Sequence, residues 1–281
     1  GTGCMDLGDI LVMPSTGKRT RSWDEYRSHF YKTQEFATPG YYSVYLTDTK
    51  VKAELTASAH VAFHRYTYDS TDSTSVLIDL QHGPAWNYKQ YHSQVNRCET
   101  HWEDAYTLVG HVQNTVWVKQ DYFFIIKFNR PVASHITLNK AADTEKGDRI
   151  VATFDGIEQG EQLLMKIAMS TTSVDGAKKN LYTEVPYWDF AAVKQSANNE
   201  WNKYLKRIDI EGTDDQKKNF YTSFYHALIQ PNQIADVDGM YRNAADKIVK
   251  AENGLFYSTF SCWDTYRAAH PFYTIVMPDR V

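Results

Sequence analysis

The sequence predicts a mostly β protein with added α structure, in which a large antiparallel β-sandwich is followed by helices. Two observations lead to this fold class. In residues 1–185, short runs alternate apolar and polar side chains with a period of two, which is typical of half-buried strands. After Pro186, apolar side chains recur every three to four residues, which is typical of amphipathic helices. We therefore expect a β-sandwich domain over residues 1–185, a linker helix over 186–212, and the beginning of an all-helical domain over 213–281.

The strand signals are short and regularly spaced, with polar turns between them. Turn dipeptides at Asp155-Gly156 and Asp175-Gly176 are consistent with this interpretation. About ten strands are more than an immunoglobulin-like module has, so we expect a larger two-sheet sandwich. The predicted strands cover residues 40–46, 51–56, 59–68, 75–80, 107–113, 116–120, 122–129, 150–154 and 162–170.

Beyond Pro186 the signals are helical. Residues 189–207 carry apolar side chains at helical intervals and form the core of the predicted linker helix. A capping-box pattern that begins at Thr213 predicts a helix over residues 214–230, which Pro231 ends. Its apolar residues lie three to four positions apart and predict one buried face, made of Phe220, Phe224, Ala227 and Leu228.

The last part of the chain predicts a turn and a second helix. Asp238-Gly239 predicts a hairpin-type turn between residues 233–237 and 240–242. Residues 260–276 predict a long helix that is bent at Pro271. The run from Asp236 to Gly239 does not match an EF-hand calcium loop, because the glycine comes fourth instead of sixth.

Charge and hydropathy exclude two classes of protein. The chain has 30 Lys and Arg against 34 Asp and Glu, a net charge of −4, which argues against a nucleic-acid partner. Its longest apolar runs, such as residues 122–126, are far shorter than the ~20 residues of a membrane span. A hydrophobic content of 42% is enough for a packed core, so we expect a globular chain without a membrane span.

Aromatic residues are abundant, at 14% of the chain. Strands favour aromatic side chains, so a β-rich core accounts for the excess. Aromatic rings also stack on the apolar faces of sugars, which mildly favours a protein that binds carbohydrate.

Cysteine and histidine give no metal signature. Three cysteines, Cys4, Cys98 and Cys262, lie far apart without a Cys-x-x-Cys motif, and we expect buried thiols. His60 and His64 share one face of a predicted strand but have no evident third ligand, so we interpret them as structural.

The strongest candidate site lies in residues 258–267. It places Trp263, Asp264 and Arg267 at the start of a predicted helix. An indole offers a stacking face, and a carboxylate can accept hydrogen bonds from two adjacent sugar hydroxyls. From spacing alone, the structural alternative is favoured: Asp264 pairs with Arg267 at i and i+3, and Trp263 packs beside them.

Several motifs occur in one order along nearly the whole chain. They cover residues 1–9, 39–44, 54–57, 63–67, 175–181, 201–205, 230–232 and 257–271. In these segments the sequence closely resembles the glycoside hydrolase family 92 α-mannosidases. The resemblance implies an exo-acting enzyme, similar to α-1,2-mannosidases, in which an N-terminal β-sandwich is joined through helices to an (α/α)6 barrel.

The resemblance also implies chemistry and site residues. It implies a calcium-dependent, inverting hydrolysis of terminal α-mannosides, and it assigns Trp263 and Asp264 to binding of the terminal mannose. Cys4 and Asp6 would approach the site from the sandwich, and Arg267 would lie beside it. The family's acid, base and most calcium ligands lie beyond Val281, so no catalytic or metal-binding residue is assigned in this chain.

The partners implied are an α-mannose-containing glycan and the N- and C-terminal parts of a longer parent chain. We expect the 281-residue chain to be inactive by itself. The resemblance implies a bacterial protein of the periplasm, the cell surface or the medium. Two alternatives from another class stay open: a non-catalytic carbohydrate-binding or interaction module derived from such an enzyme, and a lectin that binds mannose without calcium.

Overall fold

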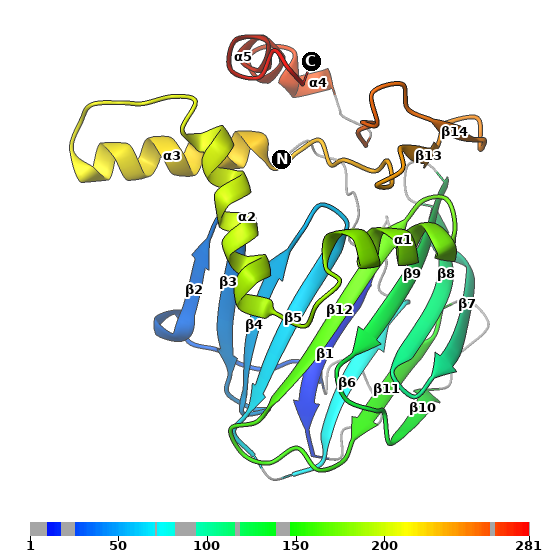
Figure 1. Cartoon of the computed structure of the whole chain (residues 1–281). Coiled ribbons are helices and arrows are strands. Elements are labelled where there is room, and N and C mark those ends of the chain that lie inside the picture. The colour runs from blue at the N-terminus through cyan, green and yellow to red at the C-terminus, as the bar shows by residue number, and fades with distance from the viewer. Residues whose placement is uncertain are drawn as a thin grey trace.

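A computed structural model describes residues 10–17, 26–70, 72–81, 94–115, 119–138, 147–258 and 262–280. Its main body is a sandwich of two antiparallel sheets (Figure 1), which confirms the predicted fold class. The larger sheet has eight strands in the order β2-β3-β4-β5-β12-β9-β8-β7, and the smaller has four in the order β1-β6-β11-β10. The strands are β1 (Leu11–Thr16), β2 (Glu35–Thr38), β3 (Tyr41–Leu46), β4 (Val51–Ala57), β5 (Val61–Tyr68), β6 (Thr74–Asp79), β7 (Gln94–Asp104), β8 (Thr107–Thr115), β9 (Lys119–Phe128), β10 (Ser134–Leu138), β11 (Arg149–Phe154) and β12 (Gln162–Ser170).

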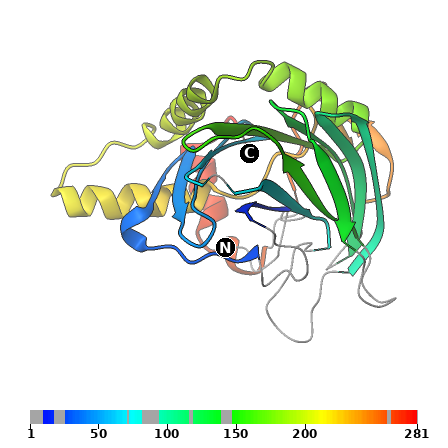
Figure 2. The ribbon, with the colours of Figure 1, turned by 90° about the horizontal axis from the view of Figure 1, so that it is seen from below.

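The eight-stranded sheet is covered on both faces. Figure 2 shows it curving around the smaller sheet, with helices on its outer side. Tyr66, Phe124 and Phe128 lie in the core between the sheets, each at most 1% exposed. On the outer face, Phe63 and Ile125 pack against residues of the first two helices. A sheet buried on both faces needs apolar side chains in both directions, which explains the continuous apolar run in the middle of β9.

Four strands of the structure are not predicted from the sequence: β1, β2, β7 and β10. β7 is a mostly polar edge strand, and an edge has no need of the alternation that marks a half-buried strand. The two strands predicted at residues 116–120 and 122–129 are a single strand, β9, and residues 116–118 lie outside the described residues. The sequence suggests a break at the polar Asp121. The strand continues through it because the buried carboxylate accepts hydrogen bonds from the neighbouring β8.

The first helix, α1 (Val174–Glu184), corrects the turn predicted at Asp175-Gly176. Ser173 is its N-cap, with a side chain that accepts a hydrogen bond from the Gly176 amide. Ala177 and Leu181 are buried against the outer face of the sheet. A dipeptide typical of turns therefore lies inside a helix, because capping and tertiary burial outweigh the local preference of Asp-Gly.

The next two helices agree with the sequence. α2 (Phe190–Leu205) begins after the N-cap Asp189, and α3 (Asp214–Leu228) has a complete capping box between Thr213 and Gln216. α3 ends at Leu228, two residues before the predicted end. Of its predicted apolar face, only Phe224 is buried, and the others remain partly exposed.

The C-terminal elements differ from the prediction in their pairing and length. The predicted turn forms, with the Asp236 amide donating to the Met240 carbonyl at 2.9 Å, but the strand ladder of β13 (Met240–Arg242) is with β14 (Ile248–Lys250). Instead of one long helix there are two short ones, α4 (Cys262–Thr265) and α5 (Ala269–Val276). Pro271 lies in the first turn of α5, where its missing N–H costs no hydrogen bond, so the break comes before it. No helix in the described part of the chain is long and apolar enough to cross a membrane.

The prediction of buried cysteines is wrong where the structure tests it. Cys262 is exposed and Cys98 is only partly buried, while Cys4 lies outside the described residues.

Candidate functional site

The predicted sugar-binding residues lie at α4. The indole of Trp263 is 80% exposed in this chain, so its face is open. Arg267 extends over the ring of Tyr266 at 5.6 Å, with Nε 3.3 Å from the phenol oxygen. The side chain of Asp264, and Cys4 and Asp6, lie outside the described residues, so the pairing of Asp264 with Arg267 stays a prediction.

Two paired backbone segments lead into α4. The amide of Ile234 donates to the Phe256 carbonyl at 2.8 Å, and Gln233 bridges to Tyr257. Ser258 closes the pair, because its amide donates to the Asn232 carbonyl at 2.7 Å and its Oγ accepts from the Asn232 amide at 3.1 Å. These contacts bring the segment before Trp263 against the Gln-Pro-Asn motif at residues 230–232.

A cavity of about 690 Å³ lies where the sandwich meets the helices. The turn between β4 and β5, α2, α3 and α5 contribute to its wall. Aromatic and charged side chains line it together, among them Glu184, Trp201, Tyr204, Tyr257, Tyr273 and Arg280. Among the described side chains, neither Trp263 nor Arg267 is part of this wall.

A buried ion pair lies at the edge of this cavity. Glu184 accepts hydrogen bonds from His60 Nδ1 at 2.6 Å and from Ser58 Oγ at 2.5 Å. Burial would lower the pKa of His60, but the hydrogen bond and charge of Glu184 outweigh it and raise that pKa. Burial would likewise raise the pKa of Glu184, but hydrogen bonds from His60 and Ser58 lower it. The pair holds the β4–β5 turn to the end of α1, in agreement with the structural interpretation of His60.

Glu54 is a second buried carboxylate, and it is fully engaged. Its two oxygens accept hydrogen bonds from Arg65 at 2.9 and 2.8 Å and from Tyr41 at 2.7 Å. Burial would raise the pKa of Glu54, but the contacts with Arg65 and Tyr41 lower it to about 2. A carboxyl group that remains ionised cannot deliver a proton at neutral pH, so Glu54 is not a general acid. The Arg65 guanidinium also lies 4.4 Å from the centre of the Phe190 ring, which joins the sheet to α2.

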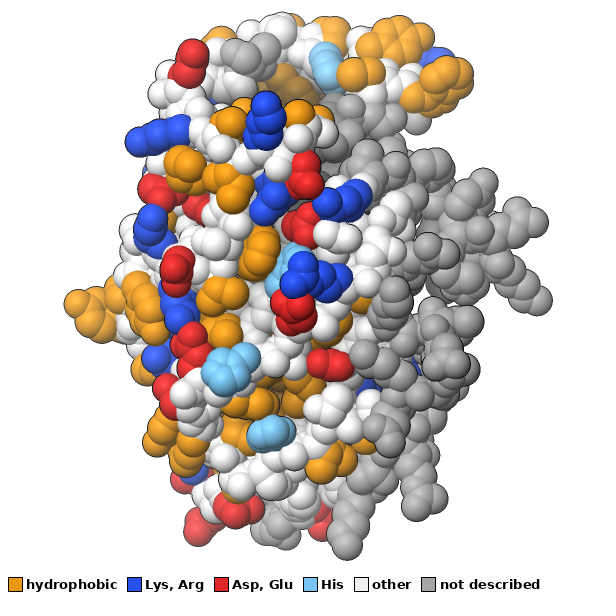
Figure 3. All heavy atoms as spheres, turned by 90° about the vertical axis from the view of Figure 1, so that its right-hand side faces the viewer, with side chains coloured by type: hydrophobic (Ala, Val, Ile, Leu, Met, Phe, Trp, Pro, Cys, Tyr) orange, Lys and Arg blue, Asp and Glu red, His pale blue; other side chains and the backbone are white. Residues whose placement is uncertain are grey.

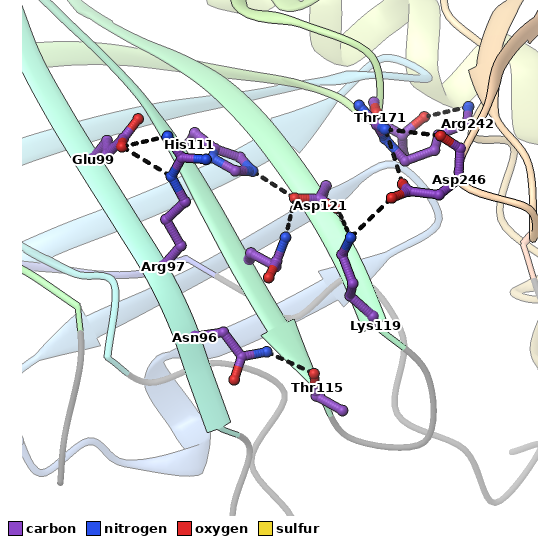
Figure 4. A network of polar contacts seen from close by, with 11 residues as sticks. Asn96, Arg97, Glu99, His111, Thr115, Lys119, Asp121, Thr171, Arg242 and Asp246 are labelled. Carbon is purple, nitrogen blue, oxygen red and sulfur yellow. Dashed lines mark hydrogen bonds and ion pairs between the residues drawn. The ribbon is translucent and has the colours of Figure 1, made fainter.

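A network of polar contacts joins the strands β8 and β9 to the β13–β14 hairpin (Figure 4). Asp121 accepts hydrogen bonds from His111 Nε2 at 2.7 Å and from Gln113 at 2.8 Å. Lys119 donates to Asp246 at 2.9 Å, and Arg242 also binds Asp246 at 2.9 Å. Among the described residues on the face shown in Figure 3, acidic and basic side chains are interspersed.

In the described residues, a calcium site would need several oxygen ligands that lie close together. Within those ranges, no three side chains of His, Cys, Asp or Glu lie close enough together to hold a metal ion. Among the described residues, no cluster of acidic side chains therefore fits a calcium site, and the calcium requirement stays a prediction.

Comparison with known proteins identifies two consecutive family domains. The family model described as the glycosyl hydrolase family 92 N-terminal domain matches residues 1–170, and the family 92 catalytic domain model matches residues 176–281. No curated protein matches the chain. The predicted boundary at residue 185 stays a prediction.

Solved structures share this fold. The family GH92 α-mannosidase BT3965 from Bacteroides thetaiotaomicron, solved alone and in complex with mannoimidazole, is 29% identical, with a TM-score of 0.86 over 98% of this chain. The inverting mannosidase BT2199 from the same species is 24% identical over 94% of the chain, with a TM-score of 0.78, and shows the likeness of fold alone. The chain spans 38% of the length of the first protein and 36% of the second. From the two family matches together, the chain belongs to glycosyl hydrolase family 92.

Proposed function

We propose that the protein to which this chain belongs is an exo-acting glycoside hydrolase that removes terminal α-mannosides from glycans. The match of consecutive segments to the N-terminal and catalytic domains of family 92 carries this proposal. The likeness to BT3965, which was solved with mannoimidazole, supports a mannose-type substrate.

In this proposal, Trp263 and Asp264 bind the terminal mannose. The exposed indole of Trp263 can stack on the apolar face of a pyranose ring. The carboxylate of Asp264 would accept hydrogen bonds from neighbouring sugar hydroxyls. Arg267, Cys4 and Asp6 would lie around this position.

The finer features of the proposal are an α-1,2 linkage, inversion at the anomeric carbon and a requirement for calcium. Inversion needs an acid and a base ~6.5–9.5 Å apart, with room for water between them. As the resemblance to family 92 implies, we assign the acid and base to the part of the parent outside this chain; the buried contacts of Glu54 with Arg65 and of Glu184 with His60 agree with this assignment. We assign most of the calcium ligands to the same part. We also propose a bacterial periplasmic, surface or secreted location.

The test is hydrolysis of an α-1,2-linked mannobiose by the full-length protein, with and without a calcium chelator. We expect activity that falls on chelation and on Asp264→Ala or Trp263→Ala. Tyr187→Ala is the matched control, because Tyr187 is 79% exposed and Trp263 80%. The 281-residue chain alone should be inactive. Hydrolysis by this chain alone would contradict the placement of the acid and base.

The open indole at Trp263 also fits a second candidate, a non-catalytic carbohydrate-binding module. Mannose binding that Trp263→Ala abolishes, without hydrolysis by the full-length protein, would favour this module. Binding that is unaffected by a chelator and independent of the helical part would favour a lectin within the sandwich.

A further inference from the structure

One carboxylate in the helical part is almost completely buried. Asp236 is 1% exposed, and it lies in the loop between α3 and β13. Its sequence context predicts only a turn, which does form: the Gly239 amide donates to the Asp236 carbonyl at 2.7 Å, and Gly239 has a φ of +82°. A turn by itself gives no reason to bury the side chain.

Three side chains from the sandwich and α1 donate to this carboxylate. Oδ2 accepts from Ser170 Oγ at 2.7 Å and from Thr172 Oγ1 at 2.8 Å. Oδ1 accepts from the Asn180 amide nitrogen at 2.8 Å. Burying a carboxylate costs desolvation free energy, and three hydrogen-bond donors offset that cost only when their geometry is right. We call Ser170, Thr172, Asn180 and Asp236 the Asp236 cluster.

Asn180 links the cluster to the backbone in both directions. Its amide nitrogen also donates to the Met169 carbonyl at 2.9 Å, and its Oδ1 accepts from the Val237 amide at 2.9 Å. Gly176 leaves the necessary space, because a Cβ there would lie 2.6 Å from Asp236 Oδ2 and 2.6 Å from Ser170 Oγ. The end of β12, α1 and the loop at residue 236 are thus fixed to one another.

The loop transmits this position to the segment before α4. Ile234, two residues before Asp236, pairs with Phe256, and Asn232 pairs with Ser258. Ser258 is five residues from Trp263. The ring of Phe256 also stacks on Tyr241 at 3.7 Å, on the other side of the turn. Residues 256–258 are therefore held by hydrogen bonds to Asn232 and Ile234, which lie in the same loop as Asp236.

Two surface ion pairs connect the same region to the sandwich and α1. Lys119 and Asp246 are 47% and 55% exposed, and Lys179 and Asp238 are 54% and 33% exposed. Exposed pairs contribute little free energy because water and salt screen them. Among these connections, the Asp236 cluster is the one from which water is excluded.

We propose that Asp236 is a positioning residue for mannoside binding: its buried carboxylate fixes residues 232–236 and 256–258 against the sandwich and so places Trp263 and Asp264. The inference rests on the proposed function. Asp236 acts through the backbone and does not itself contact the sugar.

The test compares variants of the full-length protein for mannoside hydrolysis and for amide hydrogen exchange. Asp236→Ala should lower kcat/KM by about 100-fold, mainly through KM, since small displacements of binding groups have effects of this size. Asp236→Asn keeps one acceptor for Asn180 and should recover about tenfold of that loss. Asp246→Asn, which removes the charge of an exposed carboxylate that contacts Lys119 and Arg242, should change kcat/KM by less than about fivefold.

Hydrogen exchange provides a readout that does not depend on activity. In Asp236→Asn, the amides of Ile234 and Ser258 should exchange faster while those of β9 and β12 do not change. If Asp236→Ala does not fold, Gly176→Ala serves as the second variant, because it displaces the carboxylate without removing a polar group. The same local change, with a raised KM, is expected.

Two results would overturn the inference. One is an unchanged KM in Asp236→Asn and Gly176→Ala; the other is faster exchange over the whole sandwich, which would show a general loss of stability. A wild-type protein that does not hydrolyse mannosides would instead contradict the proposed function. In that case local exchange at Ile234 and Ser258 still decides whether Asp236 fixes the segment, and the absence of any local change overturns it.

Discussion

The sandwich and the helical segment bury their apolar side chains to different degrees. In the sandwich, Tyr68, Phe124 and Ile126 have 0% exposure. In the described residues after 186, the large apolar side chains below 9% are Phe190 and Phe224, while Trp263 is 80% and Ile275 77% exposed. Within this chain the sandwich therefore buries a core of its own, whereas the described residues after 186 bury few large apolar side chains; the chain spans 38% of the length of BT3965.

The largest expected effect lies inside the sandwich. Phe124→Ala should lower the free energy of unfolding by about 3–5 kcal/mol, because it leaves a cavity between the two sheets. Urea unfolding followed by far-UV circular dichroism measures the change. The matched control is Phe36→Ala on the edge strand β2, where the ring is 56% exposed and the loss should be below about 1 kcal/mol. Equal losses would contradict the view that the sandwich core carries the stability.

The next effect concerns the joint between the sheet and α2, and it depends on pH. The pKa of Glu54 falls from 4.5 to about 2 on folding. A lowered carboxyl pKa stabilises the fold at pH values above the unfolded pKa, and this contribution is lost as the pH falls through the folded pKa. We expect a loss of about 3 kcal/mol in unfolding free energy between about pH 5 and pH 2 from this group.

Glu54→Gln should remove that part of the pH dependence, measured by urea unfolding at a series of pH values. Glu211→Gln, at an exposed position, is the control and should leave the pH profile unchanged. A Glu54→Gln profile identical to wild type would show that the contacts with Arg65 and Tyr41 do not stabilise the fold.

A smaller effect is expected at the start of α3. Thr213→Ala removes the acceptor for the Gln216 amide and should cost about 1 kcal/mol. Thr213→Ser keeps the acceptor and should retain most of this energy. Hydrogen exchange in the first turn of α3 measures it, and equal exchange in the Ala and Ser variants would argue against the capping box.

The smallest effect on stability is expected at Trp263. Because the indole is 80% exposed, Trp263→Ala should change the free energy of unfolding by less than about 0.5 kcal/mol. Under the proposed function, the same change weakens mannoside binding by the full-length protein. A large loss of stability at Trp263 would favour the structural alternative, in which the indole packs beside Asp264 and Arg267.

The sequence and the structure agree best where a signal is local. The Thr213 capping box and the period of α2 predict real helices, because capping and amphipathic burial act within a few residues. The alternating runs of β3, β4, β5 and β12 predict real strands for the same reason. The Asp-Gly dipeptide at residue 175 fails, because Ser173 and the buried face of α1 decide the local conformation.

By itself, the sequence determined the fold class, the order of strands before helices and the family, because these depend on period, turn chemistry and motifs along the chain. Only the tertiary structure decided which strands form the edges, that α1 covers the sheet, and that Asp236 is buried among donors from β12, α1 and the turn between them. The physical reason is that Asp236 and Ser170 are 66 residues apart in the chain. No local pattern records a contact of that span, since it exists only once the sandwich has packed.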